Sequence, residues 1–215
     1  MSARAARRTR ARRGEGARLR DEILDAGEAL LVQTGDEEAV SMRAIARAAG
    51  VTPPSIYLHF PDKATLIFEV CERQFERFTA HLEETAVATG DLVETLRLRA
   101  RAYVGFGLEH PEHFRVLFMA RRQRLPDGVG VEETAGGIAF ERLVTNVREA
   151  IEAGLLRPDL DPRLTALGLW CSIHGLTTLM LALPDYPWPD LDVLLDHLAA
   201  THLHGLAGGS EGPRG

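Results

Sequence analysis

Apolar side chains recur along most of the chain at intervals of three and four residues, the spacing of one face of an α-helix. Leu19, Ile23, Ala26 and Leu30 form one such stripe, with acidic residues on the opposite face and Gly35 after it. The sequence has no run of the strict two-residue alternation that is typical of a half-buried β-strand. It therefore predicts an all-α protein.

Capping residues and helix breakers divide this pattern into separate helices. Ser41 is a good N-cap for a short helix that Gly50 ends. Thr52 precedes a very short helix with Pro53 and Pro54 in its first turn, where missing N–H groups cost least. The later helices are expected at about 62–88, 91–110, 111–119, 133–153, 162–183 and 189–206, with a loop at 125–131.

Residues 42–61 have the spacing of a helix-turn-helix. Ala46, Gly50 and Ile56 stand at relative positions 5, 9 and 15 of that motif. The first position must be small because the two helices cross there, and Gly supplies the left-handed turn. The apolar residue at the third position holds the second helix against the first. The pattern therefore predicts a DNA-binding head.

The same region resembles a known family. The stretch 41–66, SMRAIARAAGVTPPSIYLHFPDKATL, is similar to the signature of the TetR family of transcriptional repressors, and the resemblance covers about residues 17–66. It implies a three-helix DNA-binding head, a linking fourth helix, a homodimer, and release of DNA when a small molecule binds. Two heads are then expected in successive major grooves of a palindromic double-stranded operator, about 34 Å apart.

Side chains of the predicted recognition helix are suited to DNA. Thr52 and Ser55 stand near its N-terminus, the end that meets base edges in this docking geometry. Tyr57 and His59 stand near its end and can donate hydrogen bonds to phosphate oxygens. Leu58 offers only an apolar contact, for example with a thymine methyl group.

Two basic residues match positions at which the TetR family contacts DNA. Arg43 lies on the helix before the turn, and an Arg–guanine pair is the commonest specific contact. Lys63 lies at the start of the fourth helix, whose N–H groups and positive dipole end also suit a phosphate. The predicted DNA-contacting residues are Arg43, Thr52, Ser55, Tyr57, Leu58, His59 and Lys63.

Charge is unevenly distributed along the chain. The 215 residues carry a net charge of −6, which by itself argues against a nucleic-acid partner. Residues 1–20 hold eight arginines and one acid, Glu15, whereas residues 21–64 carry −5 and residues 65–207 carry −8. The Arg-rich start is expected to be a disordered arm, which either enters the minor groove or raises non-specific affinity through counterion release.

These patterns predict four parts of the chain. The Arg-rich arm (1–16) precedes a helix-turn-helix DNA-binding domain (17–64), a helical ligand-binding and dimerisation domain (65–207) and a disordered tail (208–215).

The last two long helices are expected to pair with their symmetry mates as a four-helix bundle. The segment 164–184 has no formal charge over 21 positions, which reaches the length of a membrane span. Its Ser, His and Thr side chains favour a buried or interface helix instead, because polar groups in a lone span are costly. No membrane partner is predicted.

The larger domain carries a second, shorter resemblance. Trp170, His174 and Gly175, together with LEHPEHFRVLF at 108–118, resemble a TetR C-terminal subgroup named for its Trp, His and Gly. A mostly apolar pocket is expected between the helices of such a bundle. His174 is expected to be a hydrogen-bonded core histidine, or else to orient the ligand. The candidate ligand-lining residues are Phe106, Phe114, Phe118, Met119, Trp170 and His174.

The sequence offers little support for a metal, a cofactor or catalysis. Pro111 breaks the helix that would align His110 and His113, so no metal site is predicted. Cys71 and Cys171 lack metal-binding or disulfide spacing, which fits a reducing cytoplasm. The motifs of hydrolases, phosphate-binding loops and zinc proteases do not occur in the chain.

The predicted function is that of a cytoplasmic, homodimeric TetR-type regulator, without a cofactor. It is expected to be a repressor that an unknown small-molecule effector releases from its operator. Two alternatives stay open: an architectural protein that binds DNA without a ligand, and a soluble helical enzyme.

Overall fold

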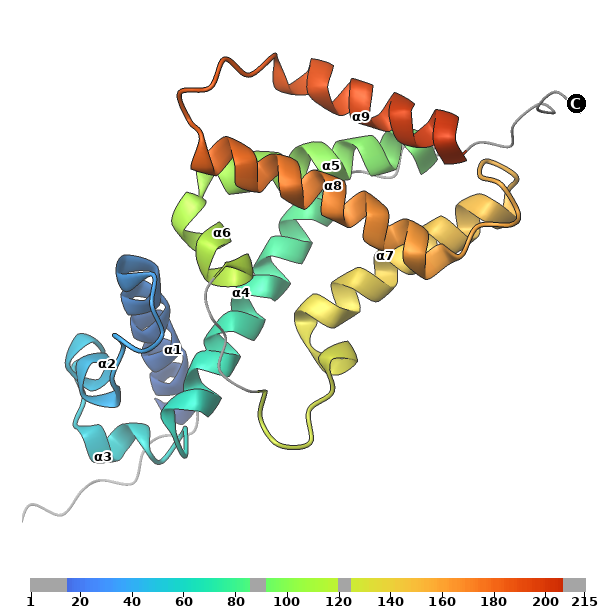
Figure 1. Ribbon diagram of the computed structural model, residues 1–215. Helices are drawn as coiled ribbons and strands as arrows, with labels where there is room; N and C mark the ends of the chain where they lie inside the picture. The colour runs from blue at the N-terminus through green and yellow to red at the C-terminus, as the bar shows by residue number, and fades with distance from the viewer. Residues whose placement is uncertain (1–14, 86–91, 120–124, 207–215) are drawn as a thin grey trace, which may run out of the picture. The chain divides into compact units, whose positions relative to one another are not determined.

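Helices make up most of the described chain. The computed structural model describes residues 15–85, 92–119 and 125–206, and within these ranges it contains helices and no β-strand (Figure 1). The prediction of an all-α protein is confirmed. The helices are α1 (Glu15–Thr34), α2 (Met42–Ala48), α3 (Pro53–Ile56), α4 (Lys63–Thr85), α5 (Leu92–Glu109), α6 (Pro111–Phe118), the 3₁₀ helix η1 (Val131–Glu133), α7 (Ala135–Glu152), α8 (Pro162–Ala182) and α9 (Leu191–Leu206).

The chain divides into two compact units within α4. The first unit holds α1, α2, α3 and the part of α4 up to Cys71, and the second begins at Glu72 and holds α5 to α9. The functional boundary predicted at 64–65 stays a prediction, as do the basic arm and the tail. Of the predicted arm, only its last two residues lie in the described part, where they already belong to α1.

An apolar core joins the four helices of the first unit. Ile23 of α1, Ile45 of α2, Ile56 of α3 and Leu66 of α4 are all 0% exposed. Gly27 allows α1 to approach α4, because a Cβ at this position would lie only 3.0 Å from a methyl carbon of Leu66. Burial of these side chains supplies the main stabilisation of the unit.

Packing in the second unit centres on α5 and α8. Helix α5 packs against α6, α8 and α9, while α7 packs against α8 and η1 (Figure 1). One group of buried side chains from α4, α5 and α6 is mostly aromatic and is called the aromatic cluster below. Its buried members are Phe75, Phe78, Tyr103, Phe114 and Leu117.

Helices α5 and α8 approach each other closely at Gly107. Thr177 of α8 is 0% exposed, and a Cβ at Gly107 would overlap its Cγ2 methyl group. The Thr177 hydroxyl donates to the carbonyl of Ile173 at 2.8 Å within α8. This bond fixes the rotamer that turns the methyl group toward α5, so Gly107 sets how close the two helices can come.

The start of α7 refines the predicted boundary. A 3₁₀ turn, η1, stands between the predicted loop and the helix, and the Glu133 carboxylate accepts a hydrogen bond from the Gly130 amide at 2.9 Å. The Thr134 hydroxyl then accepts from the Gly137 amide at 3.0 Å. This N-cap begins the helix at Ala135, two residues after the expected start.

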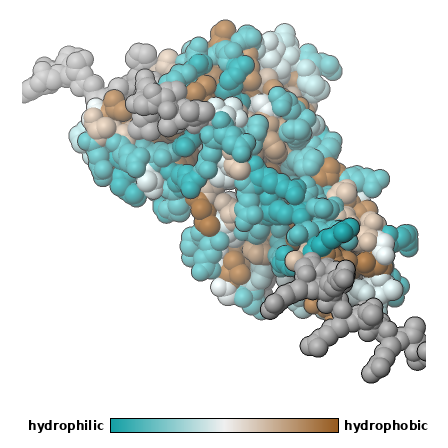
Figure 2. All heavy atoms as spheres, turned by 180° about the vertical axis from the view of Figure 1, so that it is seen from behind, coloured by the Kyte–Doolittle hydropathy of each residue, from teal (hydrophilic) through white to brown (hydrophobic). Residues whose placement is uncertain are grey.

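Helix α8 presents an unusual surface. By length and composition alone it could cross a bilayer, and 17% of its most apolar window is buried. Leu164, Leu167 and Leu179 are among its exposed side chains. The molecular face in Figure 2, by contrast, is mainly hydrophilic with apolar side chains interspersed. Several exposed leucines on one helix indicate an interaction surface.

The contact at Gly107 generates a stability prediction. Gly107→Ala should lower the free energy of unfolding by about 1–2 kcal/mol, because overpacking against Thr177 outweighs the gain in helix propensity. Chemical denaturation at fixed protein concentration measures the change. Gly105→Ala is the matched control: nothing lies within 4 Å of a Cβ there, so it should stabilise α5 by up to about 1 kcal/mol. Equal effects of both variants would contradict the contact.

Candidate functional site

The first unit contains a helix-turn-helix whose turn is closed by backbone hydrogen bonds. Ala46 is 1% exposed and Ile56 is 0% exposed, so both lie in the core between the helices. Gly50 has a φ of +67°, a conformation that favours glycine. Its amide donates to the Arg47 carbonyl at 3.2 Å, and the next amide, of Val51, donates to the Ala46 carbonyl at 2.9 Å. These two bonds form the Schellman motif that ends α2 and directs the chain into α3.

The recognition segment, residues 52–59, contains a helix that is shorter than a usual recognition helix. Helix α3 has four residues, so that Tyr57 is its C-cap and Leu58 and His59 follow it. Tyr57 is 54% exposed and Leu58 is 75% exposed, whereas His59 is half-buried. The two exposed side chains are therefore available to a partner, and Leu58 is the most prominent apolar group on this segment.

Thr52 and Ser55 contact each other at the start of α3. Their hydroxyl oxygens are 2.9 Å apart, and Thr52 makes no capping bond with its side chain. One of the two protons is used in this mutual bond, which leaves one hydroxyl proton of the pair for another acceptor. The pair thus offers a single hydrogen-bond donor at the helix end where base contact is expected.

The two predicted basic contacts differ in their surroundings. Arg43 is exposed on α2. Lys63 is half-buried, and its ammonium group donates to the Glu37 carbonyl at 2.9 Å. An ammonium group carries three protons, so Lys63 can still donate to a phosphate, but its position is fixed by the loop before α2.

The first turn of α4 is already capped by an anion. The Asp62 carboxylate accepts a hydrogen bond from the Thr65 amide at 2.7 Å. This bond and further hydrogen bonds from Thr65 and Ala64 hold the pKa of Asp62 below its ordinary value. Asp62 therefore occupies the helix end that the sequence suggested for a phosphate.

Two arginines at the start of α1 have intramolecular partners. Arg18 pairs with Glu22 at 2.8 Å. Arg20 pairs with Glu69, and its guanidinium group lies 5.0 Å from the centre of the Phe60 ring. Arg20 therefore joins α1 to α4. The six arginines that precede Glu15 lie outside the described residues.

In the second unit, the structure brings most of the predicted ligand-lining residues together. Phe114, Phe118 and His174 lie within 6 Å of one another, and Phe106 packs at the edge of the same aromatic cluster. Trp170 lies 5.9 Å from His174, measured between ring centres, and is 38% exposed. Met119 caps α6 and is 44% exposed.

Sequence reasoning missed Tyr103, which joins this group by hydrogen bonds. Its hydroxyl lies 3.0 Å from Nδ1 of His174 and accepts from the indole N–H of Trp170 at 3.3 Å. Burial raises the pKa of Tyr103 well above its ordinary range and lowers the pKa of His174 below its ordinary value. His174 is thus hydrogen-bonded but only half-buried, and both roles that the sequence left open, a core histidine and a ligand contact, stay predictions. The only sequence signal that could have pointed to Tyr103 is its position one helical turn before Gly107.

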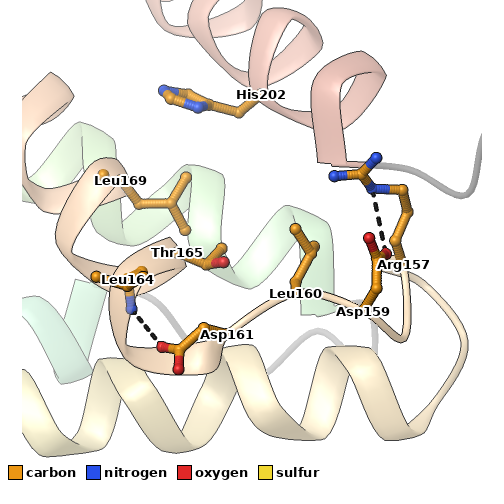
Figure 3. Close-up of a pocket in the computed structure, with 9 residues that line it drawn as sticks. Arg157, Asp159, Leu160, Asp161, Leu164, Thr165, Leu169 and His202 are labelled. Carbon is orange, nitrogen blue, oxygen red and sulfur yellow. Dashed lines mark hydrogen bonds and ion pairs between the residues drawn. The ribbon is translucent and has the colours of Figure 1, made fainter.

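A separate surface pocket of about 470 Å³ lies at the other end of α8. Figure 3 shows its labelled side chains: Arg157 faces Asp159, the Asp161 carboxylate bonds the Leu164 amide, and His202 approaches from α9. None of the predicted ligand-lining residues lines this pocket. The two acids and the single arginine leave it without a clear preference for a charged ligand.

The predicted absence of a metal site stays a prediction. Within the described ranges, no three His, Cys, Asp or Glu side chains are grouped as metal ligands. The rings of His110 and His113 lie 6.0 Å apart at the junction of α5 and α6. Cys71 is buried and Cys171 exposed, and no disulfide joins them.

Comparison with protein families gives two matches. The model described as "Bacterial regulatory proteins, tetR family" matches residues 23–70, which contain the helix-turn-helix. The model described as "Tetracyclin repressor-like, C-terminal domain" matches residues 96–207, more than half of the chain.

Individual proteins show both local and overall similarity. The chain is 41% identical over 71 residues to the transcriptional repressor KstR of Mycolicibacterium smegmatis, an alignment that spans 33% of this chain and 34% of KstR. It is 29% identical over 156 residues to the nucleoid occlusion factor SlmA of Marinobacter nauticus, spanning 68% and 73% of the two chains. A protein with unknown function from Rhodococcus sp. RHA1 superposes with a TM-score of 0.74 at 30% identity, covering 88% and 96%.

The environment of His174 generates a pH prediction. Because burial lowers its pKa from 6.5, the unfolded chain binds a proton more readily than the folded protein. The stability contributed by neutral His174 is complete above that value and is lost as the pH falls through it. Lowering the pH from about 7.5 to about 5.5 should therefore reduce the free energy of unfolding of His174→Asn by less than it reduces that of the wild type.

His197→Asn is the control for this prediction, because His197 is exposed on α9. It should keep the pH response of the wild type. Denaturant titrations at a series of pH values measure both variants, and identical pH profiles for His174→Asn and the wild type would contradict the prediction.

Proposed function

The chain belongs to the TetR family of bacterial regulatory proteins, and on that premise we propose that it represses transcription until a small molecule releases it from a palindromic operator. The observation that carries the proposal is the helix-turn-helix in the family-matched region 23–70, joined by α4 to a second unit that matches the TetR-like C-terminal domain. Membership of this family makes the chain a DNA-binding transcriptional regulator. Repression and the release of DNA by a small molecule are proposed.

The DNA contacts proposed here fall into two groups. Arg43, Tyr57 and Leu58 are exposed and reach DNA directly, with Arg43 and Leu58 reading bases and Tyr57 donating to phosphate. Thr52 and Ser55 share one hydroxyl donor at the base-contacting end of α3, while the half-buried His59 and Lys63 position the segment through hydrogen bonds to the backbone of the duplex. Pro53 and Pro54 remove two donors from α3, which leaves more of the readout to Arg43.

A homodimer formed through α8 and α9 is part of the proposal. The exposed leucines of α8 and Val193 of α9, which is 61% exposed, provide apolar surface for a second copy of the chain. Burial in this interface, rather than in a membrane, then accounts for the composition of α8, and the protein acts in the cytoplasm. The molecular mass in solution, measured by sedimentation equilibrium, tests this.

The effector is proposed to bind in the second unit, at the aromatic cluster with Phe106, Phe118, Met119, Trp170 and His174, without a cofactor. What supports this is the combination of aromatic surface with a few hydrogen-bonding groups. The finer placement in the Trp-His-Gly subgroup also remains a proposal, and the joint contact of Trp170 and His174 with Tyr103 is what supports it.

Similarity to SlmA favours one alternative, DNA binding without an effector. SlmA proteins are aligned over a larger share of this chain than KstR is, although at lower identity. KstR is named a transcriptional repressor and is 41% identical over 71 residues, which favours repression. The family matches are to regulators, which favours DNA binding over an enzymatic role.

The basic arm generates a salt-dependence prediction. The acidic head and the intramolecular pairs of Arg18 and Arg20 leave residues 1–13 as the main source of counterion release. Deleting these residues should lower the slope of the logarithm of affinity against the logarithm of salt concentration. Fluorescence anisotropy with a bound duplex measures the slope, and an unchanged slope would remove the arm from the binding mechanism.

The proposed function predicts specific and releasable DNA binding. Duplexes selected from random DNA should share an inverted repeat with half-sites about one helical turn apart. Arg43→Ala should weaken binding to the selected duplex by about tenfold and relax the preference at one base, since a bidentate Arg–guanine pair contributes about 1–3 kcal/mol.

Arg47→Ala is the matched control, because Arg47 is exposed on the same helix one turn away. A subsequent screen of small molecules should find one that dissociates the complex. Selection of no common sequence would reject the regulator, whereas specific binding that no molecule reverses would favour the alternative without an effector.

A further inference from the structure

The bond between Trp170 and Tyr103 has a fixed direction. The indole nitrogen of Trp170 can only donate, so the Tyr103 oxygen accepts this bond at 3.3 Å. The single phenol proton of Tyr103 can then be donated to Nδ1 of His174, which lies 3.0 Å from the phenol oxygen. A chain of hydrogen bonds thus runs from Trp170 through Tyr103 to His174.

The tautomer of the histidine ring follows from the direction of this second bond. When Nδ1 accepts the Tyr103 proton, neutral His174 carries its own proton on Nε2. Burial favours this neutral form, since it lowers the pKa of His174. His174 is half-buried, and Nε2 has no hydrogen-bond partner among the described residues. In this tautomer, His174 presents one N–H donor on α8.

Aromatic rings surround this donor. The Phe114 ring stacks on the His174 ring with their centres 5.6 Å apart and their planes at 24°. The rings of Phe118 and Trp170 lie at 5.4 Å and 5.9 Å, both at steeper angles. These side chains carry no charge. A flat apolar molecule would find ring surfaces to pack against and one donor to bond.

A second polar group lies one helical turn further along α8. Thr178 follows His174 by four residues, so both lie on one side of the helix. Its hydroxyl oxygen is buried and has no hydrogen-bond partner among the described residues. An unsatisfied buried hydroxyl is costly, so a ligand that bonded to Thr178 would gain the free energy of that bond.

We propose that the effector of the regulator is an uncharged cyclic molecule whose carbonyl oxygen accepts a hydrogen bond from Nε2 of His174. This inference rests on the proposed function, and it adds the chemical class of the ligand and the role of Tyr103. The partly exposed rings of Phe118 and Trp170 hold the apolar body of the ligand, while the buried Phe114 ring stacks on His174. Tyr103 is a positioning residue that keeps the donating tautomer of His174. A carboxylate is disfavoured, because its charge would be buried beside uncharged side chains.

The test uses the fluorescent naphthyl ketone prodan (propionyl-dimethylaminonaphthalene) with the full-length protein. Prodan should bind saturably to the wild type, with the shift of emission that accompanies a hydrogen-bonded carbonyl. The matching dimethylamino-naphthoate, which has a carboxylate in place of the ketone, should bind at least about tenfold more weakly. Equal affinity for the two probes would overturn the proposal.

Two substitutions of His174 separate hydrogen bonding from packing. His174→Gln keeps an acceptor for Tyr103 and an N–H donor, and should retain prodan affinity within about threefold. His174→Phe keeps the ring but removes both groups, and should weaken binding by about tenfold or more. Cys171→Ser, at an exposed position of α8, is the control and should bind as the wild type does. Tighter binding by His174→Phe than by His174→Gln would overturn the proposal.

Tyr103→Phe tests the positioning role. It should weaken prodan binding as His174→Phe does, and a normal affinity would remove Tyr103 from the site. All variants are also titrated with the selected operator duplex in the absence of prodan, which reports on folding and on the proposed function. Specific duplex binding without prodan binding would reject only the ligand class, while prodan binding without specific duplex binding would reject the repressor.

Discussion

The close contact of α5 with α8 is the constraint on which the second unit depends. Gly107 lacks a side chain, so the methyl group of Thr177 can lie directly against the backbone of α5. Tyr103 stands one turn before Gly107, and His174 stands one turn before Thr177. The same approach of the two helices therefore brings Tyr103 and His174 to 3.0 Å from each other. The packing of Gly107 against Thr177 and the hydrogen bond between Tyr103 and His174 thus depend on the same approach of α5 to α8.

The first unit uses much of its own charge to hold itself together. Arg20 joins α1 to α4, Lys63 bonds the loop before α2, and Asp62 caps α4. These bonds fix the helix-turn-helix in one conformation, which lowers the conformational entropy lost on binding DNA. In the proposed function, exposed groups such as Arg43 therefore carry sequence specificity. The arginines before α1 provide the long-range attraction to phosphate.

Local signals made most of the helices predictable from the sequence. Ser41 and Gly50 act within a few residues of themselves, so the ends of α2 could be read directly. The side chain of Lys63 was less predictable, because its partner, the Glu37 carbonyl, lies 26 residues away. The candidate ligand site likewise combines features that local sequence predicts with contacts between distant residues. Aromatic residues at helical spacing indicated the cluster, but Tyr103 has no local feature that distinguishes it from a core tyrosine.

The sequence by itself determined the helical class, most helix ends to within about two residues and the helix-turn-helix spacing, because caps, glycine turns and apolar periodicity act over short stretches of chain. Its resemblance to the TetR family also came from one continuous stretch. The tertiary structure decided which polar groups meet. Tyr103 and His174 are 71 residues apart, and only the packing of α5 on α8 makes them partners.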